Sequence, residues 1–244
     1  MIGRVLRELT AVAAALCGAL PAAAAEGWHL SASRLVLLTD RPSATVWFEN
    51  RSDIPYMVTA SAASSDETGK PSGRAADVIV SPPAKLVGAH EKAAFKTVFV
   101  GDVKEADVGT ERLRYLRLHA VPGEKAAAKS GEGVKVSVST TSWLKIFVRP
   151  ARLRVRNAAK AAELDARCRS GSAVLRNGSP YWLTVRSVRD GKKESIPQNE
   201  PSPMLAPGAE LPLDGIACGR PLRVKLVDDY GMLVPAEVRN GEGG

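Results

Sequence analysis

The chain has few histidines and cysteines, on which many enzymes and metal sites depend. It contains three histidines, His29, His90 and His119, which lie far apart and form no H-x-H or H-E-x-x-H spacing. A zinc site is therefore not expected. The sequence has no G-x-S-x-G nucleophile elbow and no G-x-x-x-x-G-K-[ST] phosphate loop. We expect no cofactor, no metal and no enzymatic activity, and we favour a binding protein over a hydrolase whose site assembles only on folding.

Long apolar runs are also lacking, except at the N-terminus. Arg4 and Arg7 precede an alanine-rich apolar stretch from residue 9 to 20, and small residues at 22–25 follow Pro21. This order is typical of a cleaved secretory signal, so we expect residues 1–25 to be a signal peptide and the rest to be exported to the periplasm. The apolar stretch is too short for a good membrane span, so no stable membrane insertion is expected.

Cysteine is scarce, with three residues in the chain. Cys17 lies inside the expected signal peptide, which leaves Cys168 and Cys218 in the mature protein. An even number of cysteines in an exported chain favours a disulfide, and two free buried thiols are the alternative. In the chain-entropy model, a disulfide that closes a loop of this length stabilises the folded protein by about 4 kcal/mol.

The charge of the chain limits the classes of partner. The formal net charge is +8, and the basic residues are spread along the sequence, with the densest run at 149–156. They are not interleaved with aromatic residues as in proteins that bind single-stranded nucleic acid. Together with export, this argues against a nucleic-acid partner, whereas a basic chain suits an acidic or carboxylate-bearing one.

Strand signals dominate the remaining sequence. Short β-branched or alternating runs recur at roughly ten-residue intervals with turn residues between them, which is typical of an all-β sandwich. We expect loops at 64–75 and 158–166, the latter with at most one helical turn, and a short strand at 153–155. Proline and arginine at the end of one such run predict a domain boundary near Pro150–Arg154.

The segment Val134–Pro150 changes character halfway along its length. Val134, Val136 and Val138 alternate with polar residues and so share one face of an extended chain. The run from Trp143 to Val148 is apolar except for Lys145, so both of its faces are expected to be buried. The valines either pack on the core of their own domain or face a partner. Lys145 either pairs with an acid, reaches solvent, or binds an anion.

Several short motifs resemble those of the PapD-like periplasmic pilus-assembly chaperones, and they occur in the same order. WLKIFVRP at 143–150 is similar to the family's IKLFYRP, and the segment at 227–231 resembles its INDYG. Ser33-Arg34 followed by Leu35-Val36 resembles its N-terminal strand. The segments at 50–58 and 80–83 resemble its N…LPYLV and TPP motifs. The matching motifs span residues 30 to 235.

The resemblance implies two immunoglobulin-like β-sandwich domains set at an angle with a cleft between them. We place them at residues 26–151 and 152–244. Family members capture pilus subunits (pilins) and deliver them to an outer-membrane usher. An exported two-domain adhesin or structural surface protein is the alternative. The motif at 110–112 and the positions of the two cysteines depart from the usual pattern, which points to a divergent or archaic-type member.

The resemblance also assigns candidate site residues. Arg34 and Lys145 match the pair that holds the C-terminal carboxylate of the subunit. The donor strand, which completes the subunit by strand addition, falls at about 134–140, and an interdomain charge cluster and three usher-facing prolines are implied as well. The residues assigned to these last three groups are Val134, Val136, Val138 and Thr140; Glu111, Arg149 and Asp229; and Pro55, Pro82 and Pro83.

Overall fold

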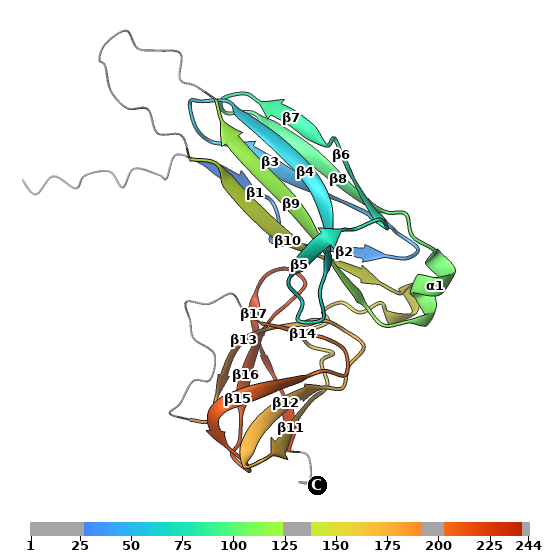
Figure 1. Cartoon of the computed structure of the whole chain (residues 1–244), viewed down its shortest axis with the longest axis vertical. Helices are drawn as coiled ribbons and strands as arrows, with labels where there is room; N and C mark the ends of the chain where they lie inside the picture. The colour runs from blue at the N-terminus through green and yellow to red at the C-terminus, as the bar shows by residue number, and fades with distance from the viewer. Residues whose placement is uncertain (1–26, 124–137, 192–202, 241–244) are drawn as a thin grey trace, which may run out of the picture.

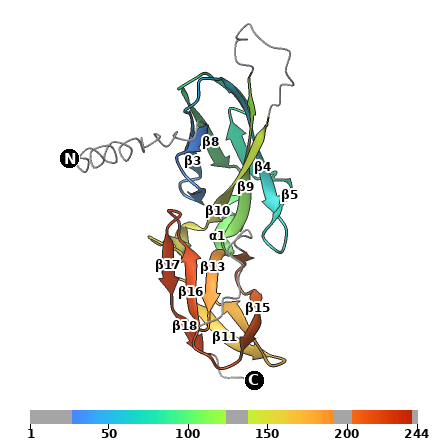
Figure 2. The same cartoon turned by 90° about the vertical axis from the view of Figure 1, so that its left-hand side faces the viewer.

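The computed structural model describes residues 27–123, 138–191 and 203–240 of the chain. They form two β-sheet domains that lie end to end along the longest axis of the molecule (Figures 1 and 2). One short helix, α1 (Val103–Val108), is present in this part. The all-β, two-domain fold predicted from the strand signals is confirmed. No helix among the described residues is long and apolar enough to cross a membrane.

The first domain is a sandwich of two sheets. One sheet has the order β1-β3-β8-β6, and the other has the order β2-β10-β9-β4-β5, with β7 also paired to β4. The strands of the first sheet are β1 (Trp28–Leu30), β3 (Ser43–Asn50), β8 (Lys92–Phe99) and β6 (Val78–Ser81). Those of the second are β2 (Arg34–Leu38), β10 (Thr140–Arg149), β9 (Arg112–Pro122), β4 (Tyr56–Ser65), β5 (Pro71–Arg74) and β7 (Ala84–Val87).

Alternating apolar side chains of the two sheets form the core of the first domain. Phe48 and Phe95 contribute from one sheet, and Leu116, Leu144 and Ile146 contribute from the other. Each such side chain is removed from water almost completely, which stabilises the domain by about 1.5–3 kcal/mol per residue. Since successive residues of a strand point to opposite faces, the odd-numbered residues of β10 face away from this core.

The second domain is a smaller sandwich with its own core. Its sheets have the orders β15-β12-β11-β18 and β14-β13-β16-β17. The strands are β15 (Glu210–Ala217), β12 (Ser172–Asn177), β11 (Leu164–Arg169), β18 (Val238–Asn240), β14 (Met204–Leu205), β13 (Leu183–Arg189), β16 (Arg223–Val227) and β17 (Leu233–Ala236). The predicted disulfide between Cys168 and Cys218 is confirmed, and it joins β11 to the residues that follow β15.

The prediction of a strand at 153–155 was wrong. A 3-10 turn, η1 (Ala151–Leu153), occupies the start of this segment, and the next two residues pair with no strand. The chain must turn here to leave the first domain, and Leu153 N–H bonds back to the carbonyl of Pro150. The Leu153 carbonyl accepts a hydrogen bond from Tyr181 Oη instead of a ladder partner. The expected boundary between residues 151 and 152 lies inside this turn and stays a prediction.

Two strands lie where loops were expected. β5 pairs with the end of β4 as a hairpin, and Asp66 holds its turn by accepting bonds from the backbone N–H groups of Thr68 and Lys70. β11 carries Arg167 and Arg169, whose charges obscure its strand pattern, and both pair with Glu210 of β15 in the same sheet. In both cases tertiary pairing outweighs a weak local preference for a strand.

Candidate functional site

Strands β2 and β10 carry the charged residues at the junction of the two domains. They run parallel, with Lys145 opposite Arg34 and Arg149 opposite Leu38. Leu144 and Ile146 point into the core of the first domain, so Lys145 and Arg149 point out of it on one common face. Two cationic groups therefore lie four residues apart on one strand, close to the second domain.

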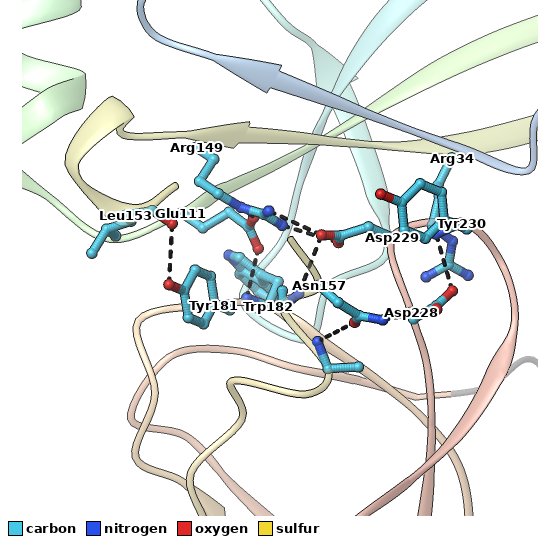
Figure 3. Close-up of polar contacts among 12 residues, drawn as sticks. Arg34, Glu111, Arg149, Leu153, Asn157, Tyr181, Trp182, Asp228, Asp229 and Tyr230 are labelled. Carbon is cyan, nitrogen blue, oxygen red and sulfur yellow. Dashed lines mark hydrogen bonds and ion pairs between the residues drawn. The ribbon is translucent and has the colours of Figure 1, made fainter. Parts of the chain in front are cut away.

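Arg149 is fully engaged by two carboxylates (Figure 3). Its Nε donates to Glu111 Oε1 at 2.6 Å, and Nη1 and Nη2 donate to the two oxygens of Asp229 at 2.9 and 3.0 Å. Glu111 directly precedes β9 of the first domain, whereas Asp229 lies in the turn between β16 and β17 of the second. The guanidinium carbon also lies 5.3 Å from the ring centre of Tyr181. The cluster therefore joins the domains through bidentate charge-assisted bonds.

The surroundings of this cluster shift the pKa values of Glu111 and Arg149. Burial raises the pKa of Glu111 to about 7, although Arg149 and the backbone N–H of Trp182 lower it. Burial lowers the pKa of Arg149, but its hydrogen bonds and charge attraction to Asp229 and Glu111 together outweigh this, so that the pKa is raised. Removing one partner of such a buried pair costs about 3–5 kcal/mol, because a buried charge is then left alone.

Arg34 and Lys145 have no comparable neutralisation. Arg34 is 9% exposed, and its Nη1 donates to the Val227 carbonyl at 3.2 Å and to Thr184 Oγ1 at 3.4 Å. Its Nε is buried and has no hydrogen-bond partner in the described part of the chain. Lys145 is half-buried, and among the described residues no hydrogen bond or ion pair reaches it. Burial lowers the pKa of Arg34, against the attraction of Asp229 and Asp228.

The two aspartates nearest to Arg34 have other partners. Asp229 binds Arg149 and the backbone N–H of Ala158. Asp228 accepts from Asn157 Nδ2 at 2.9 Å and from the N–H groups of Tyr230 and Met232. Burial and the charge of Arg34 lower the pKa of Lys145 to about 8. Two adjacent, partly desolvated cations with spare donors suit a carboxylate ligand.

The edge of β10 next to these cations is open. β2 pairs with β10 only from Lys145 onwards, because the preceding residues 31–33 bend away. No strand in the described ranges occupies this edge of residues 140–144. An unpaired edge can accept a strand from another chain.

The structure places part of the predicted donor strand at this edge. Thr140 is the first residue of β10 and is exposed. Val138 is 72% exposed and has the same parity as the core residue Leu144, so a continued strand would direct it along the core face, beyond the end of the sandwich. Val134 and Val136 lie outside the described residues.

The apolar run in β10 is buried on both faces only near the junction. There Phe147 packs with Leu113 and Tyr115 of β9 in a small apolar cluster, and Trp182 and Met204 of the second domain pack against it. Trp143 is 44% exposed, which contradicts the expectation that both faces are buried from residue 143 onwards. The reason is that the second domain covers only the last residues of the strand.

A hairpin of the first domain also contacts the second. The turn between β4 and β5 reaches towards β14 in Figure 1. Its Gly69 has φ +77°, and a Cβ there would lie 2.5 Å from Met204 Cβ. Tyr115 Oη donates to the Gly69 carbonyl, and Met204 Sδ accepts from Thr184 Oγ1 at 3.2 Å. The hairpin therefore touches Met204, and Met204 contacts the Thr184 hydroxyl that accepts a hydrogen bond from Arg34.

The three predicted usher-facing prolines lie in turns of the first domain. The carbonyl of Pro55 accepts from Gly123 N–H at 2.7 Å, and that of Pro83 accepts from Ala60 N–H at 2.8 Å. Pro82 follows a cis peptide bond after Ser81. These contacts fit rigid turns, and the assignment of the prolines to an usher stays a prediction.

Metal ligands do not gather in the part of the chain that the structure describes. No group of three or more His, Cys, Asp or Glu side chains is placed to bind a metal there. His90 contacts Asp53, and His119 contacts Thr141 Oγ1 across the β9–β10 pair.

Sequence motifs missed the groups of the second domain that hold Arg34. Thr184 and the carbonyl of Val227 belong to different strands, and a backbone carbonyl leaves no mark in a sequence. The nearest signal was the motif at 227–231, which starts at Val227.

Family models match almost the whole described chain. Residues 27–154 match the N-terminal domain of PapD, described as a pili and flagellar-assembly chaperone, and residues 159–238 match the C-terminal domain of the pili assembly chaperone PapD. The chain belongs to the PapD-like family of pilus-assembly chaperones. This is a family of chaperones rather than enzymes.

Individual relatives agree with this membership. The probable fimbrial chaperone protein ElfD of Escherichia coli (strain K12) is 25% identical over 236 residues, which cover 96% of this chain and 94% of ElfD. The chaperone protein MrkB of Klebsiella pneumoniae is 25% identical over 221 residues, which cover 89% of this chain and 93% of MrkB.

Solved structures show that the PapD-like fold is shared. The periplasmic chaperone SfaE aligns with a TM-score of 0.67 at 17% identity, over 88% of this chain and all of SfaE. The SafB chaperone, solved in complex with the Salmonella enterica SafA pilin, aligns with a TM-score of 0.68 at 22% identity. That alignment covers 86% of this chain and 94% of the matched chain.

Proposed function

We propose that this member of the family is a periplasmic chaperone that captures pilus subunits and passes them to an outer-membrane usher. It anchors the C-terminal carboxylate of the subunit at Arg34 and Lys145 and donates the strand at about 134–140. Residues 1–25 direct its export, and the mature chain acts by stoichiometric binding, without enzymatic activity. The observation that carries the proposal is the pair of unneutralised cations beside an open strand edge.

Geometry supports the anchor. A strand that enters the open slot beside β10, parallel to it as β2 is, would end just before Arg34. Its terminal carboxylate would then lie between the Arg34 and Lys145 side chains. Each charge-assisted bond that forms there contributes about 1.5–3 kcal/mol, and the end of the bound strand is thereby fixed in register.

Strand addition supplies the rest of the affinity. Main-chain hydrogen bonds along residues 140–144 would satisfy the open edge. Val138, which stands beyond the core on the core-facing side, would fill a pocket of the subunit. We assign the same task to Val134 and Val136, which have the same parity.

The remaining predicted residues support the platform and the transfer. The cluster of Arg149, Glu111 and Asp229 fixes the second domain behind the anchor. We assign Pro55, Pro82 and Pro83 to the usher-facing surface. Among the structural neighbours, SafB is bound to the SafA pilin, and CsuC is bound to the tip adhesion subunit CsuE of archaic chaperone-usher Csu pili.

Co-expression with a pilus subunit tests the proposal. The wild-type chain is expected to yield a soluble one-to-one complex, whereas Arg34→Ala and Lys145→Glu are expected to leave the subunit insoluble or degraded. Lys96→Ala removes an exposed cation from the opposite sheet and serves as the control that keeps the complex. If both anchor variants retain the complex, subunit capture by this site is wrong.

A further inference from the structure

A cavity of about 270 Å³ lies in the second domain, at the end remote from the first domain. β16 runs from Arg223 to Val227, and Val227 contacts Arg34 at the domain junction, so the residues just before β16 lie at the opposite end of the domain. Two of these residues, Arg220 and Leu222, line the cavity. β11, which forms another wall, lies at the same remote end of the molecule (Figures 1 and 2).

Small side chains at core-facing positions leave this space open. Leu164 of β11 packs in the core of the domain, and Ala166 shares its face of the strand. On β12, Leu175 packs in the same core and Ala173 shares its face. Both alanines line the cavity. Protein interiors contain few voids larger than a water molecule, so a cavity of this size is a candidate binding site.

The disulfide fixes one wall of the cavity. Cys168 and Cys218 both line it and are bonded to each other. Cys168 lies on β11, Cys218 directly follows β15, and β12 separates these two strands in the sheet. The bridge therefore holds the residues after β15 in place beside the cavity. A wall that is fixed before binding lowers the entropic cost of taking up a ligand.

Two exposed arginines also line the cavity, and neither is closely paired in the described part of the chain. Arg167 Nη1 lies 4.0 Å from Glu210 Oε1, whereas Arg169 approaches the other oxygen of Glu210 to 3.1 Å. Arg220 Nε lies 4.0 Å from Asp190 Oδ2. A separation of 4.0 Å is too long for a hydrogen bond. Three guanidinium groups thus share two carboxylates, which leaves one positive charge at this end of the domain.

We propose that this cavity binds a small organic acid, a monocarboxylate whose apolar body is about the size of one aromatic ring. The carboxylate pairs with Arg167 and Arg220 at the rim, and the apolar body packs against Ala166, Ala173 and Leu222. An apolar lining with a few polar groups is usual for ligand sites, whose volumes run from about 300 to 1,000 Å³. The cavity lies just below this range, which restricts it to small ligands. The site is independent of the proposed function.

Titration of the full mature chain with benzoate, followed by nuclear magnetic resonance, tests the site. The backbone amides of Gly219 and Asn240, which line the cavity, are expected to shift and to saturate with a Kd of about 1 mM or below. Benzamide, which is neutral, and acetate, which lacks the ring, are each expected to bind about tenfold more weakly. The inference is overturned if benzoate leaves these amides unshifted at about 10 mM, or binds no better than benzamide or acetate.

Variants of the chain assign the binding to the cavity. Arg167→Met and Arg220→Met are each expected to weaken benzoate binding about tenfold. Ala166→Leu fills the cavity from a half-buried position and is expected to abolish binding with both arginines in place. Arg239→Met is the matched control that keeps the affinity, because Arg239 is exposed on the same sheet and pairs with Asp165 outside the cavity. Unchanged affinity in Ala166→Leu and in both arginine variants contradicts the site.

A further variant separates this site from the proposed anchor, which also takes a carboxylate. Lys145→Met is expected to keep the benzoate shifts at Gly219 and Asn240. If these shifts disappear in Lys145→Met, benzoate binds at the domain junction and the cavity inference is wrong. If Lys145→Met and Arg34→Ala instead keep subunit capture, the proposed function fails and the cavity site stands.

Discussion

Arg149 and the pair formed by Arg34 and Lys145 lie on the same face of the same two strands, yet their surroundings are opposite. Two carboxylates bind Arg149, and they raise its pKa. The aspartates near Arg34 are bound elsewhere, and the pKa of Lys145 is lowered to about 8. A cation that is neutralised inside the protein stabilises the fold, whereas two cations to which no carboxylate of the described residues is hydrogen-bonded are available for an external anion.

The largest expected effect is a loss of stability when Arg149, the neutralised cation, is replaced. Arg149→Met leaves Glu111 and Asp229 facing each other in a buried site without their guanidinium. We expect the free energy of unfolding to fall by about 3–5 kcal/mol. Urea denaturation followed by circular dichroism measures this, and Arg152→Met, three positions further along the chain in the exposed turn η1, is the control. A loss below about 1 kcal/mol would show that the cluster does not hold the domains together.

A smaller effect is expected at the hairpin that contacts the second domain. Gly69→Val places a side chain against Met204. Met204 must then move, which disturbs its contact with Thr184. We expect a loss of about 1–3 kcal/mol from overpacking, together with weaker subunit binding. Gly73→Val is the matched control, since Gly73 also has a positive φ but no atom within 4 Å of an added Cβ. Equal effects at both glycines would mean that backbone strain alone is responsible.

The effect of pH on subunit binding tests the role of Lys145, one of the two cations without a carboxylate partner. The pKa of Lys145 is lowered to about 8, and a bound carboxylate favours the ammonium form and raises it. Below that pH the cation is already present, so affinity is constant; above it each complex must take up a proton. Affinity for the subunit should therefore fall about tenfold per pH unit above the pKa that Lys145 has in the unbound chain. Titration calorimetry at increasing pH measures this.

The Lys145→Met variant is the control for that titration. It should bind weakly at every pH and lose the dependence of affinity on pH above pH 8.

The same pKa shift affects the stability of the unbound protein. Since the unfolded chain keeps the lysine proton up to its ordinary pKa of about 10.5, the wild-type protein should gain stability as the pH rises from about 8 to about 10.5. A wild-type affinity that does not change above pH 8 would place Lys145 outside the binding site.

Much of the fold follows from local patterns, and the failures have physical causes. Alternation in β3, β8 and β9 predicts strands because one face of each packs on a core. The buried apolar residues of β9 change face between Tyr115 and Leu116: Leu113 and Tyr115 belong to the small apolar cluster at the domain junction, whereas Leu116 belongs to the core. β11 was missed because its arginines are paired only after folding.

The site was predictable only as far as side-chain motifs reach. The family motifs identify Arg34 and Lys145, and the register of β2 and β10 places them opposite each other. The Val227 carbonyl, the hydroxyl of Thr184 and the exposure of Trp143 depend on how two domains meet, which no short motif records.

The central claim is tested most directly by measuring stability and subunit affinity for Lys145→Met and Arg149→Met side by side. Lys145→Met should keep or slightly raise the free energy of unfolding, because a half-buried charge without an acidic partner is removed, and should lower subunit affinity at least tenfold. Arg149→Met should show a large loss of stability. A Lys145→Met protein that is destabilised as much as Arg149→Met, yet binds its subunit normally, would contradict the account.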